Sequence, residues 1–451
     1  MANWNIRLFS VTSTLLAATA AAGIAAAQTA AKTATDGQVT FTKDVAPILQ
    51  RACQNCHRTG SIAPMSLLTY QEARPWARSI KENVAKREMP PFYIDKNVGI
   101  SEFKNDASLS DAEIATIVKW VDSGAPQGNP ADMPPPRQFE DNDRFHFTPD
   151  LVVRLPKDEI LPARSPDTWK DILVDPHLTE DRWIQAVETK PTKGFRVVHH
   201  TVTSLVADDT NLAPSDGGVQ GTFLNEYAVG KNGDIFPEGA ARLIKAGTKI
   251  NFNLHLHADG EDTPLNVALA IKFYPVGYKP KHIELTENIG YVLDLDLPPN
   301  TDNIRTDRYY TLTKPTRILS FQPHMHVRGK GLCLEAIYPG GAGLTADKVE
   351  TLSCVNKYRF GWHIVYMYQD DVQPLLPAGT VLHVISWHDN TVANKANPDP
   401  DNWIGFGQRS TDDMGFAWVS LYQLSDEEFK QMVLERRERQ KAKTVSARLG
   451  Q

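Results

Sequence analysis

The sequence predicts a multidomain fold in which a small all-α domain is followed by two all-β sandwich domains of jelly-roll-like architecture. Two patterns predict it: helical periodicity near the N-terminus, then short strand-like segments between turns rich in Pro, Gly, Asn and Asp. The length of 451 residues supports it, because at about 150 residues per domain it corresponds to roughly three domains.

Charge and composition exclude several classes of protein. The chain carries 48 Lys and Arg against 54 Asp and Glu, a net charge of −6, so it lacks the basic footprint of a nucleic-acid-binding protein. No apolar run is long enough to predict an integral membrane domain. Thirteen His and four Cys point instead to metal chemistry.

Residues 1–27 have the pattern of a signal peptide. Arg7 precedes an apolar stretch over residues 8–24, and three alanines at 25–27 form a small-residue cleavage pattern. A retained N-terminal anchor is the alternative interpretation. Both place the remaining chain in the periplasm or outside the cell, where disulfides persist.

Residues 39–124 carry the helical signals. A first helix is expected to end near Arg51, and a later one to begin with a capping box formed by Ser110 and Glu113. Residues 125–144 contain clustered prolines and are expected to be a semi-rigid linker.

The β region is predicted as two copper-binding sandwich domains, at 145–285 and 286–424. Its clearest strand signal is the alternation of four large apolar residues with smaller or polar ones, at Val267, Leu269, Ile271 and Phe273. Residues 425–451 are predicted to form a helical tail, which begins with a capping box at Ser425 and Glu428.

A C-x-x-C-H motif lies in the helical segment. Cys53 and Cys56 are spaced to form two thioethers with haem, and His57 would be the proximal iron ligand. The motif predicts one covalent haem c and makes 39–124 a cytochrome c-like domain. A redox dithiol and half of a zinc site are the alternatives. Met89 is the expected sixth ligand, because the prolines at 90–91 stiffen its loop.

Three histidine pairs lie in the β region, at His199 and His200, at His255 and His257, and at His324 and His326. Side chains two residues apart on a strand share a face, so an H-x-H pair suits two-point metal binding. Adjacent histidines point to opposite faces and share a metal only at a bend or a strand end. Imidazole ligands with few carboxylates favour copper or zinc.

Over residues 145–425 this pattern resembles the copper type II, ascorbate-dependent monooxygenases, the family of peptidylglycine alpha-hydroxylating and dopamine beta-monooxygenases. The resemblance implies two sandwich domains with one copper each. It assigns the first copper to His199, His200 and His255. It assigns the second, catalytic copper to His324, His326 and Met414, which follows two aspartates.

Several positions depart from the family pattern. His257 is an additional candidate ligand beside His255. Gln322 stands where peptide-amidating members have an Arg that holds the substrate carboxylate, and Phe416 and Trp418 replace a polar Asn and Tyr. These changes favour a small, apolar organic substrate. The remaining histidines of this half are expected in packing or surface positions: His363, His383 and His388.

The resemblance and the haem motif together imply a copper-dependent monooxygenase that uses O2. The three-His copper would deliver an electron, and a periplasmic donor would reduce the haem. The alternative is a haem and copper protein that transfers electrons or binds copper without oxidising a substrate. A reductase of a small oxyanion such as nitrite is the weakest interpretation, because no Cys is placed for an electron-transfer copper.

Two cysteines remain outside the haem motif. Cys333 and Cys354 flank a loop that contains Pro339 and Gly340, so the two arms are expected to form a hairpin. An oxidising compartment then favours a cross-strand disulfide. Two buried free thiols are the alternative.

Overall fold

A computed structural model describes residues 37–449 except 60, 140–144, 208–220, 229–230, 232, 292 and 341–347. The predicted signal peptide and the end of the predicted linker lie outside the described residues. Within the described part of the chain, no helix is both long and apolar enough to cross a membrane.

The helices of the N-terminal segment are short. They are η1 (Phe41–Val45), α1 (Ala46–Ala52), α2 (Tyr70–Ala73), η2 (Arg74–Trp76), α3 (Ala77–Ala85), α4 (Asp111–Asp122) and η3 (Pro130–Asp132). The predicted capping box at Ser110 and Glu113 is confirmed, with each side chain bonding the other residue's backbone N–H.

The strands form one long sheet and three smaller ones. The eleven-stranded sheet contains β1 (Leu151–Arg154), β2 (Glu159–Leu161), β4 (Arg182–Lys193), β7 (Asp234–Ile235), β8 (Ala240–Ile244), β10 (Thr263–Phe273), β11 (His282–Ile289), β14 (Thr316–Met325), β17 (Tyr366–Met367), β18 (Leu375–Leu376) and β21 (Gly415–Gln423). One four-stranded sheet has the order β3 (Thr168–Val174), β9 (Lys249–Leu256), β5 (Val198–Val206), β6 (Thr222–Ala228). The other has the order β13 (Ile304–Thr311), β19 (Val381–His388), β15 (Gly329–Ile337), β16 (Val349–Val355), and β12 (Asp296–Leu297) pairs with β20 (Ile404–Gly405).

Each four-stranded sheet buries its apolar face against one half of the long sheet. The first core joins β5, β6 and β9 to β4, β8 and β10, with Phe252 and Leu269 at its centre. The second joins β15, β16 and β19 to β14 and β21, around Phe321 and Leu334. Alternating inward residues therefore drive both packings, as the pattern of β10 predicts.

Strand β11 joins the two halves into one sheet. It pairs in parallel with β8 and in antiparallel with β21. Arg242 on β8 and Glu284 on β11 form a buried ion pair at this junction. The predicted domain boundary at 285/286 falls inside β11, so hydrogen-bonded strands cross it.

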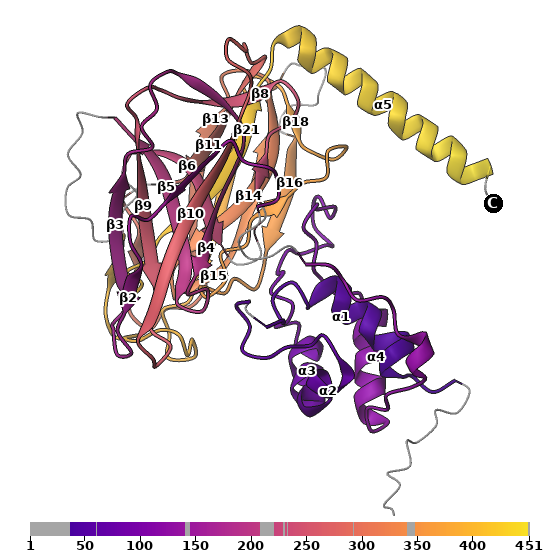
Figure 1. Ribbon diagram of the computed structural model, residues 1–451. Coiled ribbons are helices and arrows are strands. Elements are labelled where there is room, and N and C mark those ends of the chain that lie inside the picture. Colours follow the sequence, from indigo (N-terminus) through magenta and orange to yellow (C-terminus); the bar gives the residue numbers. More distant parts are fainter. Residues whose placement is uncertain are drawn as a thin grey trace, which may run out of the picture.

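The predicted fold class is wrong. The described chain is mostly β, and no small all-α cytochrome c-like domain is evident in it. The short helices share a small core around Phe41 and Trp120 and lie beside the β body (Figure 1). The two predicted sandwiches are not separate either, because one sheet runs through both.

The segment between α3 and α4 explains why the helices do not form a domain of their own. Phe92, Ile94 and Phe103 leave the helices and are buried in the second β core. Ile94 forms a β-bridge with Val355, and Phe103 forms one with Tyr368. These apolar residues follow no helical or strand period, so the sequence did not show that they are buried in the β core.

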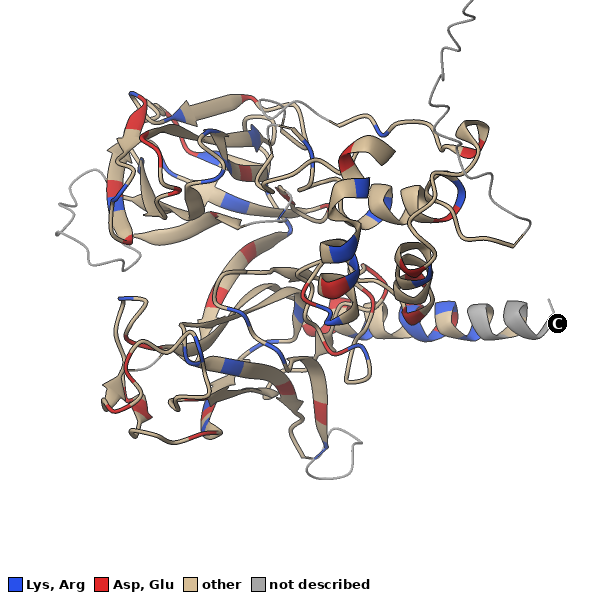
Figure 2. Ribbon diagram, turned by 90° about the horizontal axis from the view of Figure 1, so that it is seen from below, with Lys and Arg blue, Asp and Glu red and all other residues tan. Residues whose placement is uncertain are grey.

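The C-terminal helix α5 (Asp426–Leu449) begins at the predicted capping box of Ser425 and Glu428. It projects beyond the β body (Figure 1) and carries Lys and Arg along the part that Figure 2 colours. Arg436 ties it to the body through a hydrogen bond of 2.7 Å to the carbonyl oxygen of Gln373.

The predicted disulfide is present. Cys333 on β15 and Cys354 on β16 are directly opposite in the antiparallel register and are covalently joined. The loop between these two cysteines includes residues 341–347, which lie outside the described part of the chain.

Replacing both Cys333 and Cys354 by Ala should lower the free energy of unfolding by about 3 kcal/mol, because the bridge closes a loop of 21 residues in the unfolded chain. Urea unfolding with and without reductant measures this effect. The reductant should destabilise the wild type and leave the variant unchanged. Equal stability of the two oxidised proteins would contradict the prediction.

Candidate metal centre

Seven histidines lie together where strands of the first and second halves meet. They come from the ends of β5, β9 and β14 and from one loop: His199, His200, His255, His257, His324, His326 and His363. All six histidines of the three predicted pairs therefore lie in one cluster. The seventh, His363, was expected in a packing or surface position.

A break in strand pairing brings the adjacent residues His199 and His200 together. In the ladder between β5 and β9, Val198 pairs with Leu256 and His200 with His255, so His199 is an extra residue. Such a bulge bends a strand and redirects its side chains. The two imidazoles consequently approach each other, with their Nδ1 atoms 3.1 Å apart.

Two hydrogen bonds orient the outer edges of these rings. Nε2 of His199 donates to the carbonyl oxygen of Gly361 at 3.2 Å, and Nε2 of His255 donates to the carboxylate of Asp167 at 2.9 Å. A neutral imidazole that donates from Nε2 carries a lone pair on Nδ1. Such partners are typical of histidines that bind a metal through the other nitrogen.

The Nδ1 atoms converge on His200. Its Nδ1 is 3.1 Å from Nδ1 of His199 and 3.3 Å from Nδ1 of His255. Two nitrogens bound to one metal at about 2.0–2.1 Å lie about 3.3 Å apart in a tetrahedral site. Since His200 can donate only one hydrogen to two facing lone pairs, one of these two contacts has no donor in any tautomer, and a cation shared by two of the nitrogens would relieve it.

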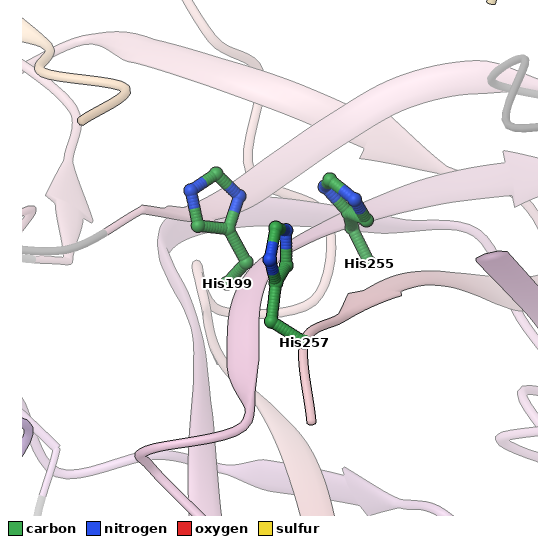
Figure 3. Close-up of side chains that lie close together, drawn as sticks. All are labelled: His199, His255 and His257. Carbon is green, nitrogen blue, oxygen red and sulfur yellow. The ribbon is translucent and has the colours of Figure 1, made fainter. Parts of the chain in front are cut away.

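Two triads have ligand atoms that all lie within 4.8 Å of one another: His199 with His255 and His257, and His199 with His200 and His363. Figure 3 shows the rings of the first triad grouped together, with His199 on β5, His255 on β9 and His257 directly after β9. His257 is thus a real neighbour of His255, as its spacing predicts. The donor set of imidazoles fits copper or zinc.

Burial keeps the imidazoles of His199, His200 and His324 neutral. Burial, together with the neighbouring His255 and His257, lowers the pKa of His199 to about 3. Burial and the adjacent His326 lower the pKa of His324 to about 3, and burial also lowers the pKa of His200. Neutral imidazole is the form that binds metal, so no proton has to leave at neutral pH.

Asp167 belongs to the candidate site by its contacts, although no sequence motif marks it. Its Oδ1 accepts from Nε2 of His255 at 2.9 Å and contacts Nε2 of His257 at 3.0 Å. Its other oxygen accepts a hydrogen bond of 2.7 Å from Ser410. Burial alone would raise the pKa of Asp167, but hydrogen bonds from His255 and Ser410 outweigh it and lower the pKa to about 2.

The histidines of the second predicted set, His324 and His326, lie at the end of β14. The rings of His324 and His326 lie 5.5 Å apart, between centroids. Met414 is buried and directly precedes Gly415, which pairs with Met325 between the two histidines. The register therefore brings the backbone of Met414 to the H-x-H pair, which the sequence alone could not establish.

Asp413 braces this end of the sheet. Its carboxylate accepts backbone hydrogen bonds from His326 at 2.9 Å and from Arg328 at 3.0 Å. His388 donates to the carbonyl oxygen of Met414 at 2.9 Å. His388 is therefore buried in a packing position, where it holds the backbone of Met414, and it does not lie on the surface. His383, by contrast, lies elsewhere, between Glu335 and Asp307.

Aromatic side chains cover one side of His324. Phe416 stacks on its ring at 4.6 Å, and Trp418 contacts Phe416 and stacks on Phe223 from the other half of the chain. Both departures from the family pattern therefore build an apolar wall beside the predicted catalytic ligands.

Gln322 has a partner of its own. Its amide donates to the carboxyl of Glu226 on β6 at 2.7 Å, and both residues are buried. Burial raises the pKa of Glu226 to about 7. This position offers no cation to a substrate, and it would place a carboxyl group against any substrate carboxylate.

The predicted haem ligands line one cavity. Cys53, Cys56, His57 and Met89 face it together with apolar residues and Trp362. Nδ1 of His57 is 3.3 Å from the carbonyl oxygen of Met65, an arrangement that leaves Nε2 free as a ligand. The apolar lining, two unpaired thiols and an oriented imidazole fit a covalent haem.

The thiol pKa values argue against the redox-dithiol alternative. Burial and the neighbouring Cys56 raise the pKa of Cys53 to about 12, and burial raises the pKa of Cys56. Reactive C-x-x-C thiols have lowered pKa values instead.

Comparisons with known proteins add little. No family model matches the chain, and no curated protein matches it. The major capsid protein P2 of bacteriophage PM2 aligns with 60% of this chain and 96% of its own length at 10% identity, with a TM-score of 0.29. A structure of broad bean stain virus aligns with 64% of this chain and 91% of its own at 10% identity, with a TM-score of 0.28. Similarities this weak support no conclusion about fold or function.

Replacing Asp167 by Asn should weaken copper binding by about 10–100-fold, because the amide no longer anchors the Nε2–H groups of His255 and His257 as a carboxylate does. Competition with a copper chelator measures the affinity. Asp158→Asn, an exposed carboxylate bonded to Lys193, is the matched control and should bind copper like the wild type. Unchanged affinity in Asp167→Asn would contradict the prediction.

Glu226→Gln should stabilise the protein at alkaline pH and have little effect in acid. The buried carboxyl keeps its proton up to about pH 7, whereas the unfolded chain loses it near 4.5, so the wild type loses stability as pH rises between these values. The difference should reach about 3 kcal/mol above pH 7.

Urea unfolding of both proteins at about pH 5 and about pH 8 measures this difference. The exposed Glu238→Gln is the control and should give none. A stability difference that does not grow with pH would contradict the prediction.

Proposed function

We propose that this chain is a periplasmic or secreted copper-dependent monooxygenase that hydroxylates a C–H bond of a small, apolar organic substrate with O2. Its electrons would arrive through a haem c attached at Cys53 and Cys56. When bound, haem and copper would supply the one-electron steps and the reduction of O2.

One observation carries the proposal: Trp362 lines the C-x-x-C-H cavity, and the next residue, His363, lies in the histidine cluster. The same loop contacts the cluster again, because the carbonyl oxygen of Gly361 accepts from His199. Two sites suited to redox cofactors therefore meet at this loop, where Trp362 borders the cavity and Phe360 and His363 contact the histidines. A mononuclear copper carrier would not need this proximity.

The two ligand sets differ in their donor atoms and would have different roles. His199, His200 and His255 offer three neutral nitrogens without sulfur, which suits a copper that cycles between oxidation states. His324, His326 and the thioether of Met414 are a softer set, which favours Cu(I), the state that reacts with O2. These assignments follow the family resemblance.

The surroundings of His324 support the choice of substrate. Phe416, Trp418 and Phe223 offer aromatic surface there, and Gln322 is occupied by Glu226. An apolar substrate loses little solvation against such a wall, whereas a carboxylate would find no cationic partner at Gln322. The disulfide between Cys333 and Cys354 supports an oxidising compartment.

Assays of the full chain, loaded with haem and copper, test this function. Oxygen uptake and hydroxylated product from apolar substrates should require copper and a reductant together, and restoring copper to depleted protein should restore both. Met414→Ala should lower product formation at least about 100-fold, as expected when a group acting at the reacting centre is removed. Met432→Ala on α5 is the thioether control.

Two results would contradict the proposal. Full activity of copper-depleted protein would exclude copper as the catalytic metal. A chain replete with copper and haem that reduces and reoxidises but consumes no additional O2 with any apolar substrate would favour the electron-transfer alternative. Loss of covalent haem in Cys53→Ala with Cys56→Ala, but not in Cys333→Ala with Cys354→Ala, tests the attachment separately.

A further inference from the structure

We propose that His363 is a further copper ligand, which joins His199 and His200. The family resemblance assigns His255 beside these two histidines and gives His363 no role. The inference rests on the proposed function only in taking copper as the metal.

Geometry places His363 among potential ligands. One nitrogen from each of His199, His200 and His363 lies within 4.8 Å of the others. The ring centroids of His363 and His200 are 4.9 Å apart, and those of His363 and His199 are 5.4 Å apart. His363 comes from a loop of the second half, whereas its two neighbours come from β5 of the first half.

Hydrogen bonding indicates that the ring is missing a partner. The side chain of His363 is buried, and neither Nδ1 nor Nε2 has a hydrogen-bond partner. A neutral imidazole has one donor and one acceptor, and leaving both buried and unpaired is costly. Both ring nitrogens of His383, by contrast, have hydrogen-bond partners, in Glu335 and Asp307.

The neighbours of His363 exclude an ion pair as the missing interaction. Its ring faces His199, His200, His324 and Phe360, which supply imidazole and phenyl surface rather than a carboxylate. A metal that accepts a nitrogen lone pair is the partner that such a set can share. The ring centroids of His363 and His324 are 5.1 Å apart, so His363 connects the first histidine set with the second.

Replacing His363 by Phe separates a ligand from a packing residue. Phe fills the space of the ring and removes the two unpaired nitrogens, so the copper-free protein should unfold at an equal or higher urea concentration. Copper affinity should nevertheless fall by more than about 100-fold, beyond the effect expected for a residue that only orients a ligand. Titration of copper ions against a competing chelator gives the affinity, and the Cu(II) EPR spectrum reports the number of coordinated nitrogens.

His383→Phe is the matched control and should behave in the opposite way. It removes a buried imidazole whose two nitrogens are both hydrogen-bonded, so it should lower stability and leave the copper affinity unchanged. Full-length His363→Phe that binds copper like the wild type, with an unchanged EPR spectrum, would overturn the proposal. A wild type that binds no copper would overturn the proposed function as well, which distinguishes the two failures.

Discussion

The pairing of β11 is the constraint on which the arrangement of this molecule depends. This strand bonds β8 on one edge and β21 on the other, and the buried pair of Arg242 and Glu284 fixes the junction. A shift of one residue in a strand register would turn every side chain to the opposite face. The register of β21 in turn sets that of β14, and so the position of the H-x-H pair relative to the histidines of β5.

Hydrogen bonds between the halves then close the site. Gln322 donates to Glu226, Ser410 donates to Asp167, and His199 donates to Gly361, and each of these pairs joins residues from the two halves of the chain. Two of these contacts involve a cluster histidine or a residue two positions from one, and the third holds Asp167, whose carboxylate contacts His255 and His257. The histidine cluster is therefore a product of the joined sheet, and neither half would build it alone.

Burial keeps several imidazoles of the cluster neutral, and it leaves some of their nitrogens without hydrogen-bond partners. Several imidazoles with lowered pKa values share one desolvated space, and His363 has no partner for either nitrogen. A folded chain accepts such unpaired groups when function requires them, and a bound cation would relieve them. The adjacent cavity around His57 shares the loop at 360–363, so a change in that loop affects both places.

Local signals in the sequence determined the elements whose causes are local. The capping boxes at Ser110 and Ser425, the alternation in β10 and the cross-strand cysteines depend on residues close together in the chain or on matched strand patterns. The histidine pairs were also visible, because their spacing is typical of metal ligands. The bend that adjacent histidines require was an expectation, and a bulge at His199 supplies it.

Only the tertiary structure decided the fold class and the membership of the site. Phe92 and Phe103 lie between helices in the sequence but are buried against strands more than two hundred residues away, so no independent all-α domain forms. His363 and Asp167 carry no motif, and their roles arise from contacts across the two halves. Long-range packing energy depends on which surfaces meet, and that information is absent from any local pattern of residues.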